Sequence, residues 1–354
     1  ETEAGMVRAL TATAWFTDYW STYWDQAVAN VEKAWKISQQ AGDEDLFHDC
    51  MIAKANKDLL SIWEVEDLLA RLETRHDLPR LKEAAFRLTW RHLFAGNYVR
   101  CIEICEMSVS LSIKLGVPPV MYATIKAIAL LGLGRYDAAA ESLQQEIAHE
   151  QYPLGKALQA FGEGLRLTQL MAFEAATQIL EDVVAQAKHV GRVWLQVWAE
   201  AELSLCLLRC ERTDEINLAW MQRDLARTAT SVLAAAPQLL GEIAFEKDDF
   251  DEALRRAGQA REEAGKYGWK PAALAALELE LRTMLKLERH ADVISQADVA
   301  LALATEFEQP SLKWRVILAK AQALDALASA EAAAEEYWKS AAIVRELAET
   351  IDDA

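Results

Sequence analysis

The sequence predicts an all-α fold, a right-handed superhelical solenoid of about nine antiparallel helix pairs. One observation is the placement of proline, which breaks the interior of a helix but suits a loop or a first helical turn. The prolines recur at steps of about 34 to 42 residues, or twice that, and long alanine- and leucine-rich stretches lie between them. They are Pro79, Pro118, Pro119, Pro153, Pro237, Pro271 and Pro310. Each is expected to mark the start of a repeat.

A recurring turn gives the same period. It combines a glycine or small polar residue, an aromatic residue, and a small residue three positions later. The series comprises Trp24 with Ala27, Gly96-Asn97-Tyr98 with Cys101, Gly134-Arg135-Tyr136 with Ala139, Phe173 with Ala176, Asp249-Phe250 with Ala253, His290 with Val293, and Ala334 followed by Trp338 and Ala341. Nine repeats fit this spacing. The second, around Trp63 to Leu69, and the sixth, around Asp214 to Leu218, are degenerate.

A small residue twelve positions before the turn alanine completes the pattern. Gly164 precedes Ala176 and Gly241 precedes Ala253 at this spacing. Small side chains let two helices cross closely while the aromatic ring fills the space beside them. The pattern resembles the tetratricopeptide repeat, with repeats longer than the usual 34 residues. Arrays of this length resemble those of MalT-type and other STAND regulators, signal-transduction NTPases that use a repeat array as their sensor.

No composition break divides the chain, so residues 1–354 are expected to form one array. Because the first residue is Glu1 and not methionine, we expect a fragment of a longer multidomain protein. The formal net charge of −18 argues against nucleic-acid binding. No apolar stretch reaches the roughly 18 residues that span a bilayer, and no signal peptide is evident. A cytoplasmic location without membrane contact is therefore expected.

Motifs for chemistry are missing from the sequence. The five cysteines fit a reducing compartment, and the pairs four residues apart suit helix packing better than a metal site. The histidines are dispersed, and no glycine-rich segment continues into a phosphate-binding loop. The acidic runs at 42–45 and 248–252 match helix starts, where carboxylates cap free N–H groups. We expect no enzyme activity, no cofactor and no metal.

Aromatic residues carry the binding hypothesis. Twelve tryptophans are present, and six aromatic residues crowd positions 15–24, more than one core-facing stripe can hide. The tetratricopeptide resemblance implies that the first helix of each hairpin lines a concave groove. The implied ligand-facing residues are Phe16, Tyr19, Trp20, Phe86, Arg87, Trp90, Trp194, Trp198, Glu202 and Arg209. Whether each ring faces the groove or the core is left open, and the rings near residue 20 are expected to be partly exposed.

These features indicate a non-catalytic sensor or scaffold array. It is expected to capture a protein or peptide ligand, or a small molecule, in its groove and to regulate an effector domain in the same full-length chain. The alternative is an autonomous peptide receptor of the quorum-sensing type, also built of tetratricopeptide-like repeats. Arginine beside tryptophan in the groove suits a ligand that carries carboxylates next to apolar side chains.

Overall fold

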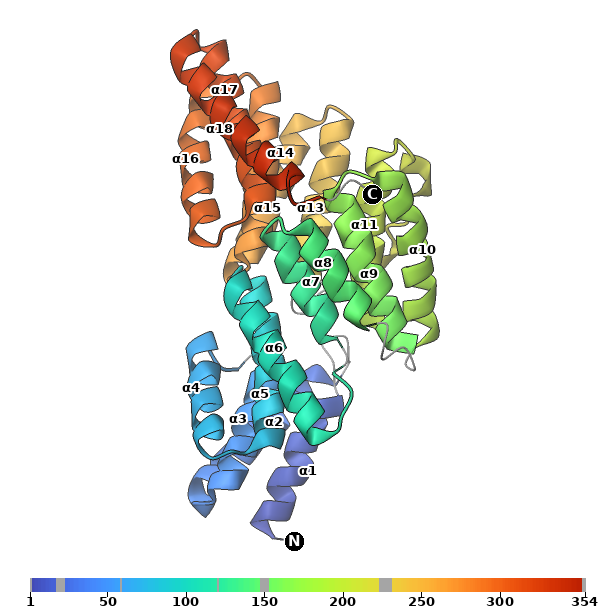
Figure 1. Cartoon of the computed structure of the whole chain (residues 1–354), viewed down its shortest axis with the longest axis vertical. Coiled ribbons are helices and arrows are strands. Elements are labelled where there is room, and N and C mark those ends of the chain that lie inside the picture. The colour runs from blue at the N-terminus through green and yellow to red at the C-terminus, as the bar shows by residue number, and fades with distance from the viewer. Residues whose placement is uncertain are drawn as a thin grey trace.

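The computed structural model describes residues 2–16, 23–57, 59–119, 121–146, 153–222 and 231–351 (Figure 1). These residues form α-helices, one short 3-10 turn (Thr213–Glu215) and no strand. The helices are α1 (Glu3–Phe16), α2 (Trp24–Ala41), α3 (Glu44–Asn56), α4 (Ile62–Thr74), α5 (Leu78–Phe94), α6 (Tyr98–Leu115), α7 (Tyr122–Gly132), α8 (Tyr136–Glu146), α9 (Pro153–Gln169), α10 (Phe173–His189), α11 (Val193–Arg209), α12 (Ala219–Gln222), α13 (Ser231–Glu246), α14 (Phe250–Tyr267), α15 (Lys270–Lys286), α16 (His290–Glu306), α17 (Pro310–Ala326) and α18 (Ala330–Ala348).

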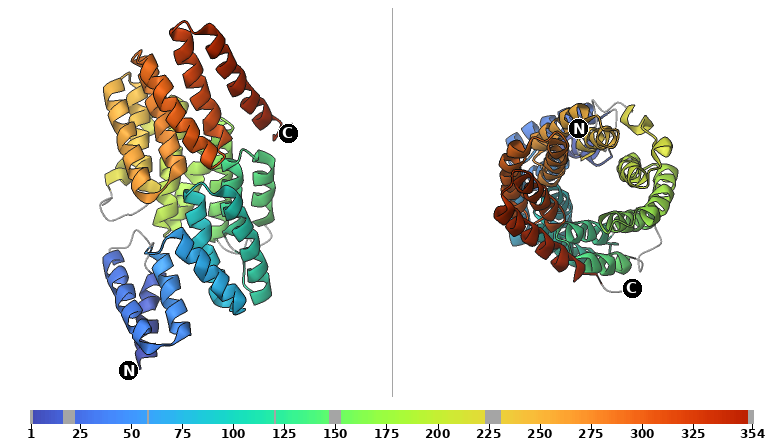
Figure 2. Two further views of the ribbon diagram at one scale, coloured as in Figure 1. Left: turned by 90° about the vertical axis from the view of Figure 1, so that its left-hand side faces the viewer. Right: turned by 90° about the horizontal axis from the view of Figure 1, so that it is seen from above.

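Successive helices run antiparallel and pack against each other, and the pairs wind into a right-handed superhelix (Figure 2). The predicted fold class is therefore confirmed. The sixth pair is degenerate as predicted, because within the described residues its second helix is only the short α12. No helix in the described ranges is both long and apolar enough to cross a membrane.

Most of the described turns between helices share one geometry. A residue with positive φ follows the helix, and the next N–H donates to a carbonyl five residues back, which is the Schellman motif. Asn97 donates to His92 (2.8 Å) and Asp249 donates to Ala244 (2.9 Å) in this way. Glycine takes the positive-φ position at 96, 134, 191 and 268, but Met171, Asp248, Glu288 and Ala328 take it elsewhere. The turn therefore recurs even where the glycine signal is lost.

Six of the seven prolines lie where the sequence predicts them. Pro153 and Pro310 are the first residues of α9 and α17, and Pro79 and Pro271 lie in the first turns of α5 and α15. Pro118 and Pro119 lie between α6 and α7. Pro237 does not fit this prediction, because it lies inside α13. It is buried there, so packing outweighs its missing N–H group.

Small residues make the close helix crossings that the sequence indicates. A Cβ atom added at Gly164 would lie 2.7 Å from Leu180 of α10, and one at Gly241 would lie 2.9 Å from Leu279 of α15. In the last repeat the predicted position of the small residue at the helix crossing is wrong by one residue. Ala333 is 2% exposed and makes the crossing, whereas Ala334 is exposed.

The superhelix closes on itself. The α7–α8 turn meets the end of α18, where the Thr350 hydroxyl donates to the Gly134 carbonyl (2.8 Å) and the Asp137 N–H donates to the Thr350 carbonyl (3.2 Å). The α5–α6 turn meets the α16–α17 turn, and the rings of Tyr98 and Phe307 lie 6.4 Å apart. One apolar core therefore joins α5–α7 with α15–α17. Closure therefore makes the hairpins of α5–α8 neighbours of α15–α18, one winding further along the superhelix axis (Figure 2, left).

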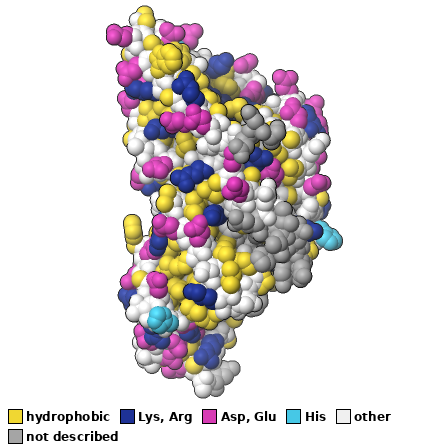
Figure 3. Space-filling view, in the orientation of Figure 1, with side chains coloured by type: hydrophobic (Ala, Val, Ile, Leu, Met, Phe, Trp, Pro, Cys, Tyr) yellow, Lys and Arg dark blue, Asp and Glu magenta, His cyan; other side chains and the backbone are white. Residues whose placement is uncertain are grey.

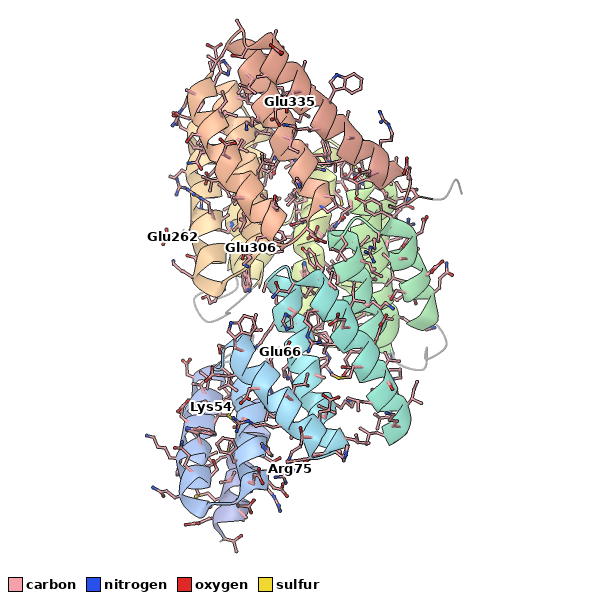
Figure 4. The ribbon with its side chains drawn as sticks, turned by 60° about the vertical axis from the view of Figure 1, so that its left-hand side comes forward. Lys54, Glu66, Arg75, Glu262, Glu306 and Glu335 are labelled. Atoms are coloured by element: carbon pink, nitrogen blue, oxygen red, sulfur yellow. The ribbon has the colours of Figure 1, made fainter. Side chains whose placement is uncertain are left out.

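An ionic cluster joins α4 to the hairpin of α5 and α6. Glu66 of α4 accepts hydrogen bonds from Arg100 of α6 at 2.9 Å and lies 3.0 Å from the buried His92 of α5 (Figure 4). Burial lowers the pKa of His92, although Glu66 opposes this effect. The Asn97 amide lies 3.2 Å from the other ring nitrogen of His92. These contacts fix α4 against the hairpin of α5 and α6.

Two glycines of α9 provide a matched test of the close crossings. Gly164→Ala is expected to lower the free energy of unfolding by about 1 kcal/mol, because the new methyl group overpacks the fully buried Leu180. Gly155→Ala should raise it by about 0.5 kcal/mol, because the added methyl group meets open space. Urea unfolding followed by circular dichroism measures both. Equal effects of the two variants would contradict the packing described for α9 and α10.

Candidate ligand-binding interior

An aromatic cluster forms where α5, α9, α11 and α15 approach one another inside the superhelix. We define the aromatic cluster as Trp90, Phe94, Phe161, Trp194, Trp198 and Trp269. The Trp90 ring lies 6.0 Å from that of Trp194 and 6.4 Å from that of Trp198. Phe161 meets Trp198 edge to face at 4.9 Å. Three of the ten predicted ligand-facing residues are therefore brought together at one place.

Closure of the superhelix extends this cluster across the interior. Phe94 of α5 lies 6.1 Å from Trp198 of α11 and 5.8 Å from Trp269, which precedes α15. Sequence reasoning did not select Phe94, Phe161 or Trp269. Phe94 follows Trp90 by four residues and so shares its helix face, which is the only signal that could have identified it. The contacts of Trp269 depend on closure and leave no local trace in the sequence.

A narrow pocket lies beside these rings. Its lining consists of three tryptophans of α5 and α11 and of residues from α7, its N-cap and α9: Trp90, Trp194, Trp198, Met121, Thr124, Ile125, Ile128, Leu158 and Phe161. No part of it is wide enough for a water molecule. Trp90, Trp194 and Trp198 are only half-buried.

Glu202 adds the one carboxyl group among the predicted residues. It lies one helical turn after Trp198 on α11 and is partly buried. Burial raises the pKa of Glu202 to about 7, and a hydrogen bond from the Trp198 indole partly offsets this effect. At neutral pH the group therefore exists in both protonation states. It can accept hydrogen bonds from a ligand, and a cationic ligand would favour its ionised form.

The predicted arginines already have partners. Arg209 of α11 donates to Glu246 and to Glu242 of α13, each at 2.7 Å. Glu242, only 5% exposed, also accepts from Arg282 of α15 at 2.6 Å. This ladder of charges links α11, α13 and α15. The guanidinium of Arg209 therefore already donates to two carboxylates of the chain itself. The guanidinium of Arg87 lies 5.0 Å above the ring of Phe86, which in turn meets Tyr122 edge to face.

The remaining predicted residues belong to the first repeat. Phe16 is the last residue of α1, but its side chain lies outside the described part of the structure. Tyr19 and Trp20 also lie outside the described residues. Their predicted exposure therefore stays a prediction.

The cysteines and acidic runs have the structural roles that the sequence indicates. Cys101, Cys105 and Cys206 are free and buried in helix packing. No group of three or more possible metal ligands occurs among the described residues. Asp43 caps α3 by accepting from the backbone of residues 45 and 46, and Asp249 caps α14 in the same way.

Comparisons with known proteins place the fold. No protein-family model matches the sequence, and no curated protein matches it either. A Rap protein solved in complex with Competence and Sporulation Factor is similar with a TM-score of 0.66 and 13% sequence identity, over 98% of this chain and 100% of its own. The Rap conjugation gene regulator of plasmid pLS20, solved with the Phr* peptide, gives a TM-score of 0.56 at 13% identity, over 99% and 97%. The shared feature is the helical-repeat architecture.

Glu202 predicts a pH dependence of stability. Between its ordinary pKa of 4.5 and its folded pKa of about 7, the folded chain binds more protons at this site than the unfolded chain. The Glu202 contribution to stability therefore falls as pH rises through this window and stays low above it. Glu202→Gln should be more stable than the parent at pH 8 by at least about 1 kcal/mol, and this advantage should shrink towards pH 5. Urea unfolding at several pH values measures it.

The exposed Glu211, just beyond the end of α11, provides a control. Glu211→Gln should leave the pH profile of the parent unchanged. A constant difference between Glu202→Gln and the parent across this pH range would show that the carboxyl is well hydrated.

Proposed function

We propose that the chain is a non-catalytic receptor that binds a peptide in the interior of the superhelix. The observation that carries this proposal is the aromatic cluster, which gathers half-buried indole rings from α5 and α11 around an apolar pocket. Exposed or half-exposed tryptophans of this kind provide large contact area at small entropic cost. Trp90, Trp194 and Trp198 would form the centre of the site, and Phe86 and Arg87 would extend it along α5.

The charges around this centre favour one ligand chemistry. Glu202 lies beside Trp198, and the neighbouring ladder includes Glu242 and Glu246 with arginines that they already neutralise. A ligand carboxylate would have to displace Glu246 to reach Arg209. A basic or hydrogen-bond-donating side chain would instead meet the indole face and the Glu202 carboxyl together. We therefore propose an apolar peptide with a basic residue as the ligand that fits best.

The comparisons support a peptide ligand. The Rap conjugation regulator, which shares this architecture over nearly its whole length, is solved with the Phr* peptide. The other similar Rap protein is solved with Competence and Sporulation Factor. At 13% sequence identity, these similarities show a shared fold and do not identify the ligand. The ligand assignment therefore depends on the side chains of this chain.

Two arrangements could use such a receptor. In the first, a single array spanning residues 1–354 senses a peptide, protein or small ligand and acts on an effector domain of the same chain, as in MalT-type regulators. In the second, the array is an autonomous peptide receptor of the quorum-sensing type. That the two similar Rap proteins are solved with the Phr* peptide and with Competence and Sporulation Factor favours the second arrangement. Phe16, Tyr19 and Trp20 would contact the effector in the first arrangement.

A positional-scanning library of short synthetic peptides tests the binding proposal. Native mass spectrometry should detect retained peptides that combine an apolar residue with lysine or arginine. The best of these peptides should bind Trp198→Ala at least about tenfold more weakly, because a central indole is lost. Glu202→Gln should weaken only the peptides with a basic residue. Calorimetric titration measures both effects.

Trp63→Ala serves as the control, because Trp63 is 80% exposed on α4, away from the cluster. It should bind the same peptides as the parent. Retention of no library peptide, or equal affinity of the parent and Trp198→Ala, would contradict the proposed site.

A further inference from the structure

The last helix of the array exposes a face that its counterparts bury. In α16 the residues at positions 293, 297, 300 and 304 are all 0% exposed, and in α14 the equivalent residues are at most 1% exposed. In α18 the matching residues are Ala333 (2%), Tyr337 (36%), Ser340 (5%) and Val344 (44%). Ser340 donates to the Trp314 carbonyl of α17 (2.9 Å), so the buried half of this row packs within the hairpin.

Beside this row lies a stripe that no described helix covers. We define the terminal face as Ala334, Trp338, Ala341, Arg345 and Ala348, with Tyr337 and Val344 along its edge. All of these residues are exposed, and Trp338 is 71% exposed. In Figures 1 and 2, α18 is the outermost helix at the end of the array. Large apolar side chains are unusual here, because the end of a repeat array normally carries a polar face for solubility.

The terminal face has a period of seven. Its three alanines lie seven residues apart, and Trp338 and Arg345 also differ by seven. A seven-residue repeat is typical of helices that pair along their length. Alanine at each repeat lets the two helix axes approach closely, while larger side chains fill the space beside them.

We propose that the terminal face binds the same face of a second copy of this chain, with the two α18 helices antiparallel and Ala341 on the twofold axis. In this register Ala334 lies opposite Ala348, and Trp338 lies opposite Val344. The same register sets Tyr337 opposite Arg345. A symmetric dimer needs such a self-complementary patch, because one surface must match itself.

The local charges on the terminal face fit a second copy as the occupant. Arg345 makes no ion pair with any described residue, and the facing ring of Tyr337 would receive its guanidinium as a cation–π partner. The terminal face itself contains no carboxylate, although acidic side chains are scattered over the surface in view (Figure 3) and Glu335 lies close by on α18 (Figure 4). The net charge of −18 opposes association at long range. Salt should therefore strengthen the dimer by screening this repulsion.

The interface is small. A single pair of helices of this length buries an area near the low end, about 1,200 Å², of what specific complexes use. The dimer is therefore expected to dissociate in the micromolar range. It does not require a ligand in the interior, so the dimer and the peptide site can be tested separately.

Sedimentation equilibrium of the full chain tests the proposal. The parent should shift from monomer to dimer as its concentration rises, and more so at high salt. Trp338→Glu should remain monomeric, because it places a carboxylate opposite the apolar Val344 within the contact. Trp63→Glu, which alters an equally exposed tryptophan on α4, should dimerise like the parent. Circular dichroism confirms that each variant is folded.

Cross-linking tests the register. In a Cys210→Ser background, which removes the one native cysteine that is not fully buried, Ala341→Cys should form a disulfide-linked dimer under mild oxidation. Ala332→Cys, exposed on the opposite side of α18, should do so at least about tenfold more slowly. A parent that stays monomeric at all concentrations, dimerisation of Trp338→Glu, or equal cross-linking at both positions would overturn the proposal.

Discussion

The turns at residues 95–97 and 132–135 pack against the α16–α17 turn and the end of α18, and the interior depends on this contact. Two glycines with positive φ make it possible, because a Cβ atom at Gly96 would lie 2.8 Å from Phe307 and one at Gly134 would overlap Leu347. Closure presses α5 towards α11 and α15. Without it, the contact between Phe94 of α5 and Trp269, which precedes α15, would be lost from the aromatic cluster.

The sequence could predict those features of the fold that depend on residues within a single hairpin. Proline placement, the twelve-residue spacing of Gly164 to Ala176, and the capping aspartates each act within one hairpin, so they can be recognised in a linear chain. The turns at Met171 and Ala328 carry no glycine, and Pro237 lies inside a helix. Pro237 is buried, so packing outweighs local preference there. Met171 and Ala328 are exposed, and the hydrogen bonds from residues 172 and 329 to residues 167 and 324 hold these two turns.

The site was predicted in part for the same reason. The tetratricopeptide register selects Trp90, Trp194 and Trp198 because it counts positions along each first helix. It cannot find Trp269 or the Arg209–Glu242–Arg282 ladder, because these contacts depend on the rotation between successive hairpins summed over many repeats. The same ladder changes the chemistry of the interior. Arg209, which was predicted to bind a ligand carboxylate, instead donates to Glu242 and Glu246 of the chain itself. Glu202 remains beside the indole rings.

The distance across the closure tests this account most directly. Arg135 and Glu349 are exposed, and each adjoins a residue of the Gly134–Thr350 contact, so nitroxide labels at cysteines placed there would report on it without disturbing the core. Pulsed electron paramagnetic resonance should give one narrow, short distance that disappears when Gly134→Leu blocks the approach of Leu347. A broad distribution at long distances in the parent chain would show that the hairpins do not meet, and the shared aromatic interior would then not exist.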